Sequence, residues 1–414
     1  MDAGDMGLEK VGRESVLLGK TVVLGVTGSV AAYKAVDIAS KLTQEGACVE
    51  VVMTPAAVEF VRPLNFRSVT GRPVATEMFE MTSEFSIEHV ALAQAADVVA
   101  IAPATANTIA KLAAGMADNL LCSTVLATKA PVIIAPAMNV NMWDNSFTQD
   151  NLAKLRHHGF IIVGPGHGWL AEGRIGFGRM VDPTQIIGTI KQVLGRKGDL
   201  AERHIVVTAG GTQEPVDPVR HIGNRSSGKM GYALAEAARD RGARVTLVAG
   251  PTALPDPVAV TVLHVRTAEE MYEAVVKAVP EADALLMAAA VADYRPAEQS
   301  PEKIKKDAAS LVLRLTRTKD ILEEVRGDFI RVGFAAESND LVANAEKKLK
   351  RKDLDLIVAN DISHSDSGFG ADTNRVIILE RSGRVEDVPL LPKRLVADRI
   401  LDKVVTLLVR RARG

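Results

Sequence analysis

Apolar residues recur in short runs along this chain, and most of the runs lead into a glycine-containing turn and then a helical pattern. In residues 20–54 the run TVVLGV is followed by a Gly/Ser turn and by apolar positions, from Ala32 to Leu42, at helical spacing. Gly46 ends that pattern, and a second apolar run follows. The segment therefore predicts a strand, a turn, a helix and a second strand.

The same order of elements begins again near residue 203. RHIVVTAGG (203–211) is followed by GKMGYALAEAARDRGARVTLVAG (228–250), and ADVVAIAPA (96–104) has a counterpart in ADALLMAAA (282–290). Short strands rich in Val, Ile, Leu and Ala that alternate with helices imply parallel sheets covered on both faces. We therefore expect an α/β fold of two Rossmann-like three-layer domains, with ligands at the carboxyl ends of the strands.

A polar stretch, LGRKGDLAER (194–203), separates the two halves. A chain of 414 residues is long enough for two domains. The first residues lack the pattern of a signal peptide, and every apolar run is broken before the roughly 18 residues that a membrane span needs. We expect a loose leader over residues 1–18, a first domain over 19–194, a linker over 195–202 and a second domain over 203–414.

The charge of the chain limits the kinds of molecule it is expected to bind, and its cysteines indicate the redox environment. Lys and Arg number 50 and Asp and Glu 51, a formal charge of −1, which gives no general attraction to nucleic acid or anionic lipid. We expect small-molecule partners, with neither nucleic acid nor membrane. Cys48 and Cys122 form no CxxC or Cys/His cluster, which favours a reducing cytoplasm and argues against structural zinc.

Several loops of the first half follow strands and would meet at one sheet edge. GVTGSVAAYK (25–34) places Ser29 and free backbone amides at a helix start, which suits a phosphate, although many such turns need glycine for geometry alone. Thr54, APATANT (102–108) and PAMNVNMW (136–143) follow other strands. Together they predict a ligand site without a basic cluster.

GSVAAYK, SIEHVALA, APATANTIAKLAAGMADNLL, PAMNVNMW and GxGRM together resemble the flavin-dependent cysteine decarboxylases, most closely the decarboxylase half of bifunctional phosphopantothenoylcysteine decarboxylase/phosphopantothenate–cysteine ligases. The resemblance implies a flavodoxin-like fold, with His89 as catalytic base and Asn139 holding the substrate carboxylate. Met138 is implied as a substrate contact, although it suits a core position equally well. The implied FMN contacts are Gly28, Ser29, Val30, Thr54, Thr105 and Asn107.

The glycine-rich segment GWLAEGRIGFGRM (168–180) departs from that family. In the family the corresponding loop reads LACGxxGxGRM, and its cysteine protonates the enethiol left after decarboxylation. The shared GxGRM ending aligns Glu172 with this cysteine. A closed lid could raise the pKa of a glutamic acid toward neutrality, so we expect Glu172 to be the acid. The alternative is an incomplete flavoprotein or scaffold that binds FMN without full turnover.

The second half contains a long polar loop (210–231) in which residues 226–229 precede a helix, another start suited to an anion. The pattern GxxxxGK[ST] is absent, which disfavours P-loop NTPase chemistry. Further motifs are AAAVADYRP (288–296), PEKIKK (301–306), GFAAES (333–338) and AEKKLKRKDLDLIVAND (345–361). By itself, the lysine run in the last of these would be typical of a solvated helix face.

In this order, these motifs resemble the ligase half of the same bifunctional family, over about residues 203–400. The resemblance implies that 4'-phosphopantothenate is joined to cysteine through an acyl-cytidylate made from CTP, with Mg²⁺ as counter-ion; the sequence itself indicates no metal ligands. Asn224 is implied in the reaction with cysteine, and Lys303 in catalysis. TKDI (318–321) stands where the family usually reads NPDI. The implied CTP contacts are Asp293, Lys303, Thr318, Lys319, Asp320, Ile321, Phe334, Lys348 and Lys352.

The resemblance thus implies a bifunctional enzyme of coenzyme A biosynthesis that ligates first and decarboxylates second. It also implies a homo-oligomer with trimeric decarboxylase and dimeric ligase contacts, and a dodecamer is one assembly compatible with both. A rival interpretation is an NAD(P)-linked oxidoreductase. Neither half has a clean GxGxxG with an acidic residue about 20 positions later, which disfavours that class.

Overall fold

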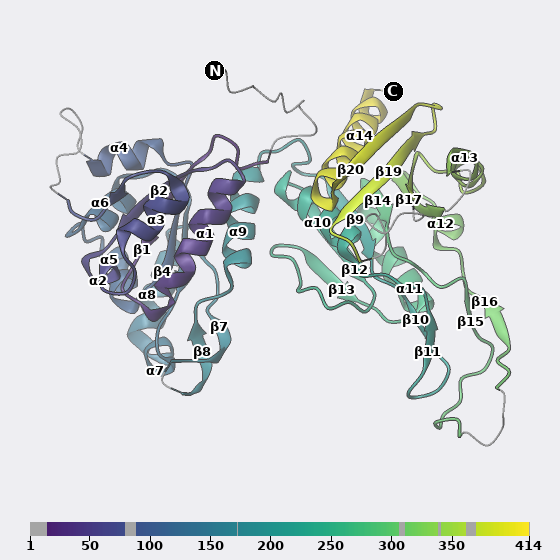
Figure 1. Ribbon diagram of the computed structural model, residues 1–414, viewed down its shortest axis with the longest axis horizontal. Helices are drawn as coiled ribbons and strands as arrows, with labels where there is room; N and C mark the ends of the chain where they lie inside the picture. Colours follow the sequence, from purple (N-terminus) through teal and green to yellow (C-terminus); the bar gives the residue numbers. More distant parts are fainter. Residues whose placement is uncertain are drawn as a thin grey trace, which may run out of the picture. The chain divides into compact units, whose positions relative to one another are not determined.

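The computed structural model describes residues 15–78, 88–171, 173–305, 311–337, 341–361 and 370–413. It separates into two compact units, one ending at Gly195 and the other beginning at Arg196. Each unit has its own sheet and its own covering helices (Figure 1).

The first unit is built on a six-stranded parallel sheet in the order β3-β2-β1-β4-β5-β6. This order means that the chain winds outward from β1, returns, and continues on the other side from β4. The connections after β1 and β4 therefore run toward opposite sides of the sheet, and the carboxyl ends of two such strands are where ligands bind in folds of this kind. The strands are β1 (Thr21–Val26), β2 (Cys48–Met53), β3 (Val74–Ala75), β4 (Val98–Ala104), β5 (Val132–Pro136) and β6 (Ile161–Ile162).

Helices cover both faces of this sheet, with one core around Leu24 and Ile38 and another around Ile101 and Ile109. Leu17 is fully buried in the first core. The elements are η1 (Val30–Ala32), α1 (Tyr33–Gln44), α2 (Pro55–Val58), α3 (Pro63–Thr70), α4 (Glu88–Ala95), α5 (Ala106–Ala114), α6 (Leu120–Ala127), α7 (Val140–Asp144), α8 (Ser146–His157), α9 (Pro183–Gly195), and the hairpin of β7 (Gly166–Trp169) and β8 (Ile175–Arg179).

The second unit contains an eight-stranded sheet in the order β13-β12-β9-β14-β17-β18-β19-β20. Its first six strands are parallel, as expected, but β19 and β20 are antiparallel. A short turn between β19 and β20 allows only an antiparallel pair, because a parallel pair needs a long crossover. The strands are β9 (His204–Ala209), β12 (Arg244–Ala249), β13 (Thr261–His264), β14 (Ala284–Met287), β17 (Ile330–Glu337), β18 (Leu356–Asp361), β19 (Thr373–Glu380) and β20 (Val385–Pro392).

This sheet is also covered on both faces, with α10 and α14 over one core and α11 to α13 over the other. Leu200, within the stretch predicted as a linker, is fully buried in the first of these cores. The remaining elements are α10 (Lys229–Asp240), α11 (Ala268–Ala278), η2 (Val279–Glu281), α12 (Ile321–Glu324), α13 (Leu341–Arg351), α14 (Lys393–Arg413), the hairpin of β10 (Gln213–Pro215) and β11 (His221–Gly223), and the hairpin of β15 (Tyr294–Pro296) and β16 (Leu315–Arg317).

The expectation of two Rossmann-like three-layer α/β domains is confirmed. Within the ranges that the structure describes, no helix combines the length and the apolar character that crossing a membrane requires.

Candidate functional site

In the first unit, the loops after β1 and β4 are tied together at the point where the two halves of the sheet diverge. The hydroxyl of Thr27 donates to the carbonyl of Pro103 at 2.7 Å and accepts from the Thr105 amide at 3.0 Å. Gly28 lets the loops after β1 and β2 touch, because a Cβ there would lie 2.6 Å from the Cβ of Ala56. These contacts form a closely packed cradle of backbone at the edge where a ligand is expected.

Thr54 lines this edge with a polar atom that the described residues leave unsatisfied. Its Oγ1 is buried and has no hydrogen-bond partner among them. Such a group costs on the order of 1–3 kcal/mol unless a ligand or water completes it. Ser29 and Thr105 cap η1 and α5, whereas Val30 and Asn107 are exposed. Apolar surface, backbone and a few hydroxyls fit a flavin and its phosphate.

The loop after β5 is joined to the β7–β8 hairpin. The Met138 amide donates to the Gly178 carbonyl at 2.9 Å, and Asn139 accepts a hydrogen bond from the Asn141 amide at 2.7 Å as it caps α7. A Cβ at Gly178, whose φ is +138°, would lie 2.3 Å from the Met138 carbonyl oxygen. The hairpin that contains the GxGRM sequence is therefore packed directly against the two predicted substrate residues.

His89 is half-buried in the first turn of α4, which packs against α6. Because α4 leads into the parallel strand β4, its first turn lies toward the carboxyl edge of the sheet. Glu172 lies outside the described residues. Its neighbours belong to the connection between β7 and β8, where the Leu170 amide donates to the Arg174 carbonyl at 2.8 Å.

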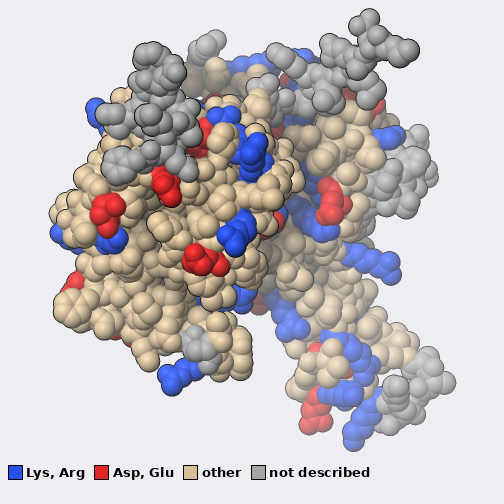
Figure 2. Space-filling view, turned by 60° about the vertical axis from the view of Figure 1, so that its left-hand side comes forward, with Lys and Arg blue, Asp and Glu red and all other residues tan. Residues whose placement is uncertain are grey.

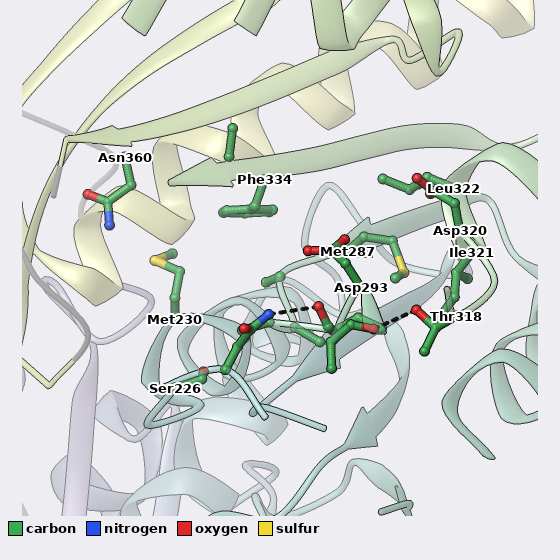
Figure 3. Close-up of a pocket in the computed structure, with 18 of the residues that line it drawn as sticks. Ser226, Met230, Met287, Asp293, Thr318, Asp320, Ile321, Leu322, Phe334 and Asn360 are labelled. Atoms are coloured by element: carbon green, nitrogen blue, oxygen red, sulfur yellow. Dashed lines mark hydrogen bonds between the residues drawn. The ribbon is translucent and has the colours of Figure 1, made fainter. Parts of the chain in front are cut away.

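The second unit has a cavity of about 1170 Å³ beside the carboxyl ends of β14 and β18 (Figure 3). The start of α10, the loop after β14 and the loop between β16 and α12 line it. Asn224 donates to the Val291 carbonyl at 2.9 Å, and Thr318 donates through its hydroxyl to the Ala292 carbonyl at 2.6 Å. These two hydrogen bonds connect the cavity's walls to the loop after β14.

One end of the cavity contains an aromatic ring beside two lysines. Lys348 on α13 donates to the Phe334 carbonyl at 2.9 Å, and the Lys352 ammonium lies 2.5 Å from an Asp320 carboxylate oxygen. Lys352 is 8% exposed, so its charge acts in a partly desolvated environment. The cavity brings together the predicted nucleotide contacts Asp293, Thr318, Lys319, Asp320, Ile321, Phe334, Lys348 and Lys352.

Lys303 is not among the residues that line this cavity. It is exposed on the arm between β15 and β16, next to Ile304, whose carbonyl accepts from Arg220 at 2.6 Å. Figure 2 shows Lys and Arg side chains gathered on the lower projection, where Figure 1 places this arm. The exposed cations of the described arm are Arg295, Lys303, Lys305, Arg314 and Arg317.

The other end of the cavity contains polar residues that the sequence analysis did not single out. Asn374 is 4% exposed, and its Oδ1 and that of Asn360 are buried with no hydrogen-bond partner within the described residues. Buried amide oxygens are normally satisfied, so both indicate a ligand with donor groups. The available signal for Asn360 was its place near the carboxyl end of a buried strand, β18. Asn374 reaches the cavity only because β19 pairs antiparallel with β18.

Two lysines at helix starts complete this end. Lys229, the first residue of α10, donates to the Gly370 carbonyl at 2.8 Å and pairs with Asp372 at 2.7 Å. Lys393, the first residue of α14, is 8% exposed and donates to the Ala371 carbonyl. Burial, and then repulsion by Lys229, lower the pKa of Lys393. Cations beside two helix N-termini favour an anionic group.

No group of three or more His, Cys, Asp or Glu side chains suited to a metal occurs in the part of the chain that the structure describes. The cavity therefore offers cations and hydrogen-bond donors to an anion, with no protein cage for a metal ion among those residues.

Comparison with known proteins gives the same division of the chain. Residues 12–195 match the Flavoprotein family, and residues 200–408 match the family described as DNA/pantothenate metabolism flavoprotein C-terminal domain. A solved C-terminal domain of a coenzyme A biosynthesis bifunctional protein CoaBC is 40% identical and covers 51% of this chain and 99% of its own, with a TM-score of 0.45.

Curated relatives match over nearly the whole length. The coenzyme A biosynthesis bifunctional protein CoaBC of Vibrio vulnificus (strain CMCP6) is 44% identical over 398 residues, 95% of this chain and 99% of the relative. That of Bacillus subtilis (strain 168) is 43% identical over 95% of this chain and 98% of the relative. The chain therefore belongs to the family of coenzyme A biosynthesis bifunctional proteins CoaBC.

Proposed function

We propose that the second unit ligates 4'-phosphopantothenate to cysteine with CTP, and that the first unit decarboxylates the product with FMN. The observation that carries the ligase proposal is the cavity, with Lys348 and Lys352 at one end and Lys229 and Lys393 at the other. A cavity with cations at both ends fits two anionic substrates that meet in its middle.

The ligase reaction has two steps. A carboxylate oxygen of phosphopantothenate attacks the α-phosphorus of CTP, a P–O bond forms, and pyrophosphate leaves. The cysteine amine then attacks the acyl carbon, loses a proton, and displaces CMP. Lys348 and Lys352 would stabilise the charge that develops on the phosphates. Mg²⁺ would bind mainly through the triphosphate, as it does where no protein cage holds it.

We assign the opposite end of the cavity to phosphopantothenate. Its phosphate would lie at the start of α10 near Lys229 and Lys393. Its hydroxyl and amide groups would donate to the unsatisfied oxygens of Asn360 and Asn374. Asn224, fixed by its bond to Val291, would lie near the acyl group where the two ends meet.

Pyrophosphate release tests the ligase assignment. We expect release with CTP, phosphopantothenate and cysteine, and a much lower rate with ATP. Lys352→Met should reduce kcat/KM about tenfold or more, since it removes a partly buried cation from the phosphates. Lys347→Met is the matched control because Lys347 is exposed on the neighbouring helix α13 and does not line the cavity.

Asn374→Leu provides the corresponding test of the substrate end. We expect a higher KM for phosphopantothenate with the KM for CTP unchanged, because the variant removes an acceptor only from that end.

Lys303→Gln tests the exposed arm. A loss of turnover would mean that the arm brings Lys303 into the cavity, although Lys303 does not line the cavity in this structure. Undiminished turnover would remove Lys303 from the mechanism.

For the first unit, bound FMN would supply a reversible acceptor for an electron pair. Thr54, Ser29 and Thr105 would bind it at the sheet edge, with Gly28, Val30 and Asn107 beside it. Asn139 would hold the departing carboxylate without a charge, with Met138 beneath the substrate. His89 would accept the substrate's proton, and Glu172 would return one to the enethiol.

The mass of the products separates full turnover from the alternative of an incomplete flavoprotein. Protein loaded with FMN is incubated with phosphopantothenoylcysteine. We expect 4'-phosphopantetheine from the native chain and the oxidised enethiol from Glu172→Gln. If the native chain accumulates the enethiol, Glu172 does not replace the family's cysteine. His89→Asn should abolish both products while the flavin spectrum of the bound protein is retained.

We also propose that the chain forms a homo-oligomer. Exposed apolar residues on the β7–β8 hairpin and on the arm, including Trp169, Ile175 and Val312, support this because large exposed apolar surfaces usually mark contacts. Light scattering of the full chain tests it, and a monomeric mass would contradict it.

A further inference from the structure

The loop of residues 317–320 lies at the nucleotide end of the cavity, and three of its residues are held by three different elements. Thr318 bonds to Ala292 after β14, and Asp320 pairs with Lys352 after α13. Lys319, between them, is held by α11. On one side the loop continues into exposed β16, and on the other into α12, which is anchored by the buried Ile321. The cavity-facing position of the loop therefore depends on these tethers.

The ammonium of Lys319 is directed away from the cavity. It lies 2.7 Å from a Glu269 carboxylate oxygen and 4.3 Å from the centroid of the Tyr272 ring. Neither Glu269 nor Tyr272 lines the cavity, although Lys319 does. An ammonium bound in this way cannot contact the phosphates at the same time. The role of Lys319 therefore differs from that of Lys348 and Lys352.

The helix that holds Lys319, α11, is capped at its start and anchored in the core. Thr267 and Glu270 form a capping box at the start of α11, and the Ala268 amide donates to the buried Glu214 carboxylate at 2.9 Å. Met271 and Val275 anchor the same helix in the core. Glu269 lies in the first turn, where a helix favours negative charge. The ion pair and the cation–π contact thus connect a loop residue to a helix that is packed in the core of the unit.

We propose that Lys319 is a positioning residue for the nucleotide: the Glu269–Tyr272 clamp on its ammonium holds loop 317–320 in the conformation that binds CTP. The inference rests on the proposed ligase function. It assigns Glu269 and Tyr272, which touch no substrate, to nucleotide affinity. The hydrogen bond that the Lys319 ammonium donates to the Glu269 carboxylate raises the pKa of Lys319.

Steady-state kinetics of the full chain test this assignment. Lys319→Met should raise the KM for CTP roughly three- to tenfold and leave kcat nearly unchanged, because an exposed ion pair and one cation–π contact are each modest. Glu269→Gln should have a similar effect, and the double variant should be no worse than the worse single variant. Lys319→Arg, which can make both contacts, should restore the KM. Lys277→Met, on the exposed face of α11, is the matched control.

Two kinetic results would overturn the assignment. Additive losses in the double variant would mean that Lys319 and Glu269 act independently. A loss of kcat with unchanged KM in Lys319→Met would mean that the ammonium acts on the reacting phosphates.

Hydrogen exchange of the nucleotide-free chain gives a measurement that does not need activity. Residues 317–324 should exchange faster in Lys319→Met than in the native chain and in Lys277→Met. Equal exchange would overturn the inference. Failure of the native chain to release pyrophosphate from CTP, with the exchange difference intact, would instead overturn the proposed ligase function.

Discussion

In the second unit, the absence of a side chain at Gly231 allows helix α10 to pack closely against strand β9. A Cβ at Gly231 on α10 would lie 2.5 Å from the Cβ of Ala209 and 2.7 Å from the Thr208 carbonyl oxygen on β9. Alanine is normally the better helix former by about 1 kcal/mol. At this position the clash should outweigh that gain, and we expect Gly231→Ala to lower the free energy of unfolding by about 1–3 kcal/mol. Chemical denaturation measures it, and Gly370→Ala, with open space around its Cβ, should be neutral.

His204 gives the second unit a dependence on pH. Its Nδ1 donates to the Glu281 carbonyl at 3.2 Å and its Nε2 accepts from Thr246 at 2.9 Å, so the neutral ring satisfies both bonds. Burial, and then Arg244, lower the pKa of His204 below its ordinary value. Below pH of about 6.5 the unfolded state therefore binds more protons than the folded state, and stability is lost as pH falls.

The variant His204→Gln tests this pH dependence, because glutamine can form hydrogen bonds but does not take up a proton in this pH range. We expect the slope of unfolding free energy between about pH 6.5 and 5 to become shallower than in the native chain. Above pH 7 the slopes of the two proteins should coincide. An unchanged slope in the acid range would show that other groups control it.

At the residue scale, several residues that the family resemblance implied for the nucleotide line one cavity, whereas residues that depend on later strand pairings were missed. Thr318, after β16, and Phe334, within β17, both line the cavity. Asn374 and Lys393 were missed because antiparallel β19 and β20 bring them back to the carboxyl end of β18. A motif can place a residue near a strand, but the direction of a long arm such as that of Lys303 depends on tertiary contacts.

Among the elements, the β7–β8 hairpin packs against Met138 and Asn139, so its backbone conformation affects the proposed decarboxylase site. Gly178→Ala would force the hairpin away from Met138 and Asn139, since the added Cβ has no room and the positive φ disfavours it. We expect the variant to lose decarboxylase activity, measured as carbon dioxide release, by about tenfold or more. Pyrophosphate release by its ligase unit should be unchanged, and equal loss of both activities would contradict this argument.

Element boundaries were predicted best where glycine or a polar run interrupts an apolar pattern. Helix α1 ends at Gln44, just before the predicted stop at Gly46, and α10 begins at Lys229 within the predicted anion-binding segment. Burial near the boundary segments was less predictable. Leu17 lies beside Val16 and Leu18, and Leu200 lies in a polar stretch, but the burial of both depends on cores assembled from distant strands.

At the scale of the whole molecule, each unit has its own core clusters and its own sheet. We expect calorimetry to resolve two unfolding transitions. FMN should raise one of them and CTP the other, because a ligand stabilises the unit that binds it in proportion to RT ln(1 + [L]/Kd). Gly231→Ala should lower only the transition that CTP raises. A single transition shifted by both ligands would mean that the units unfold together.

The division at Gly195 and Arg196 also has a genetic consequence. Since none of the core clusters formed by the described residues contains residues of both units, damage to one site need not spread to its neighbour. Two defective alleles, one encoding His89→Asn and the other Lys352→Met, should complement each other when expressed in the same cell, as if the chain were two genes joined end to end.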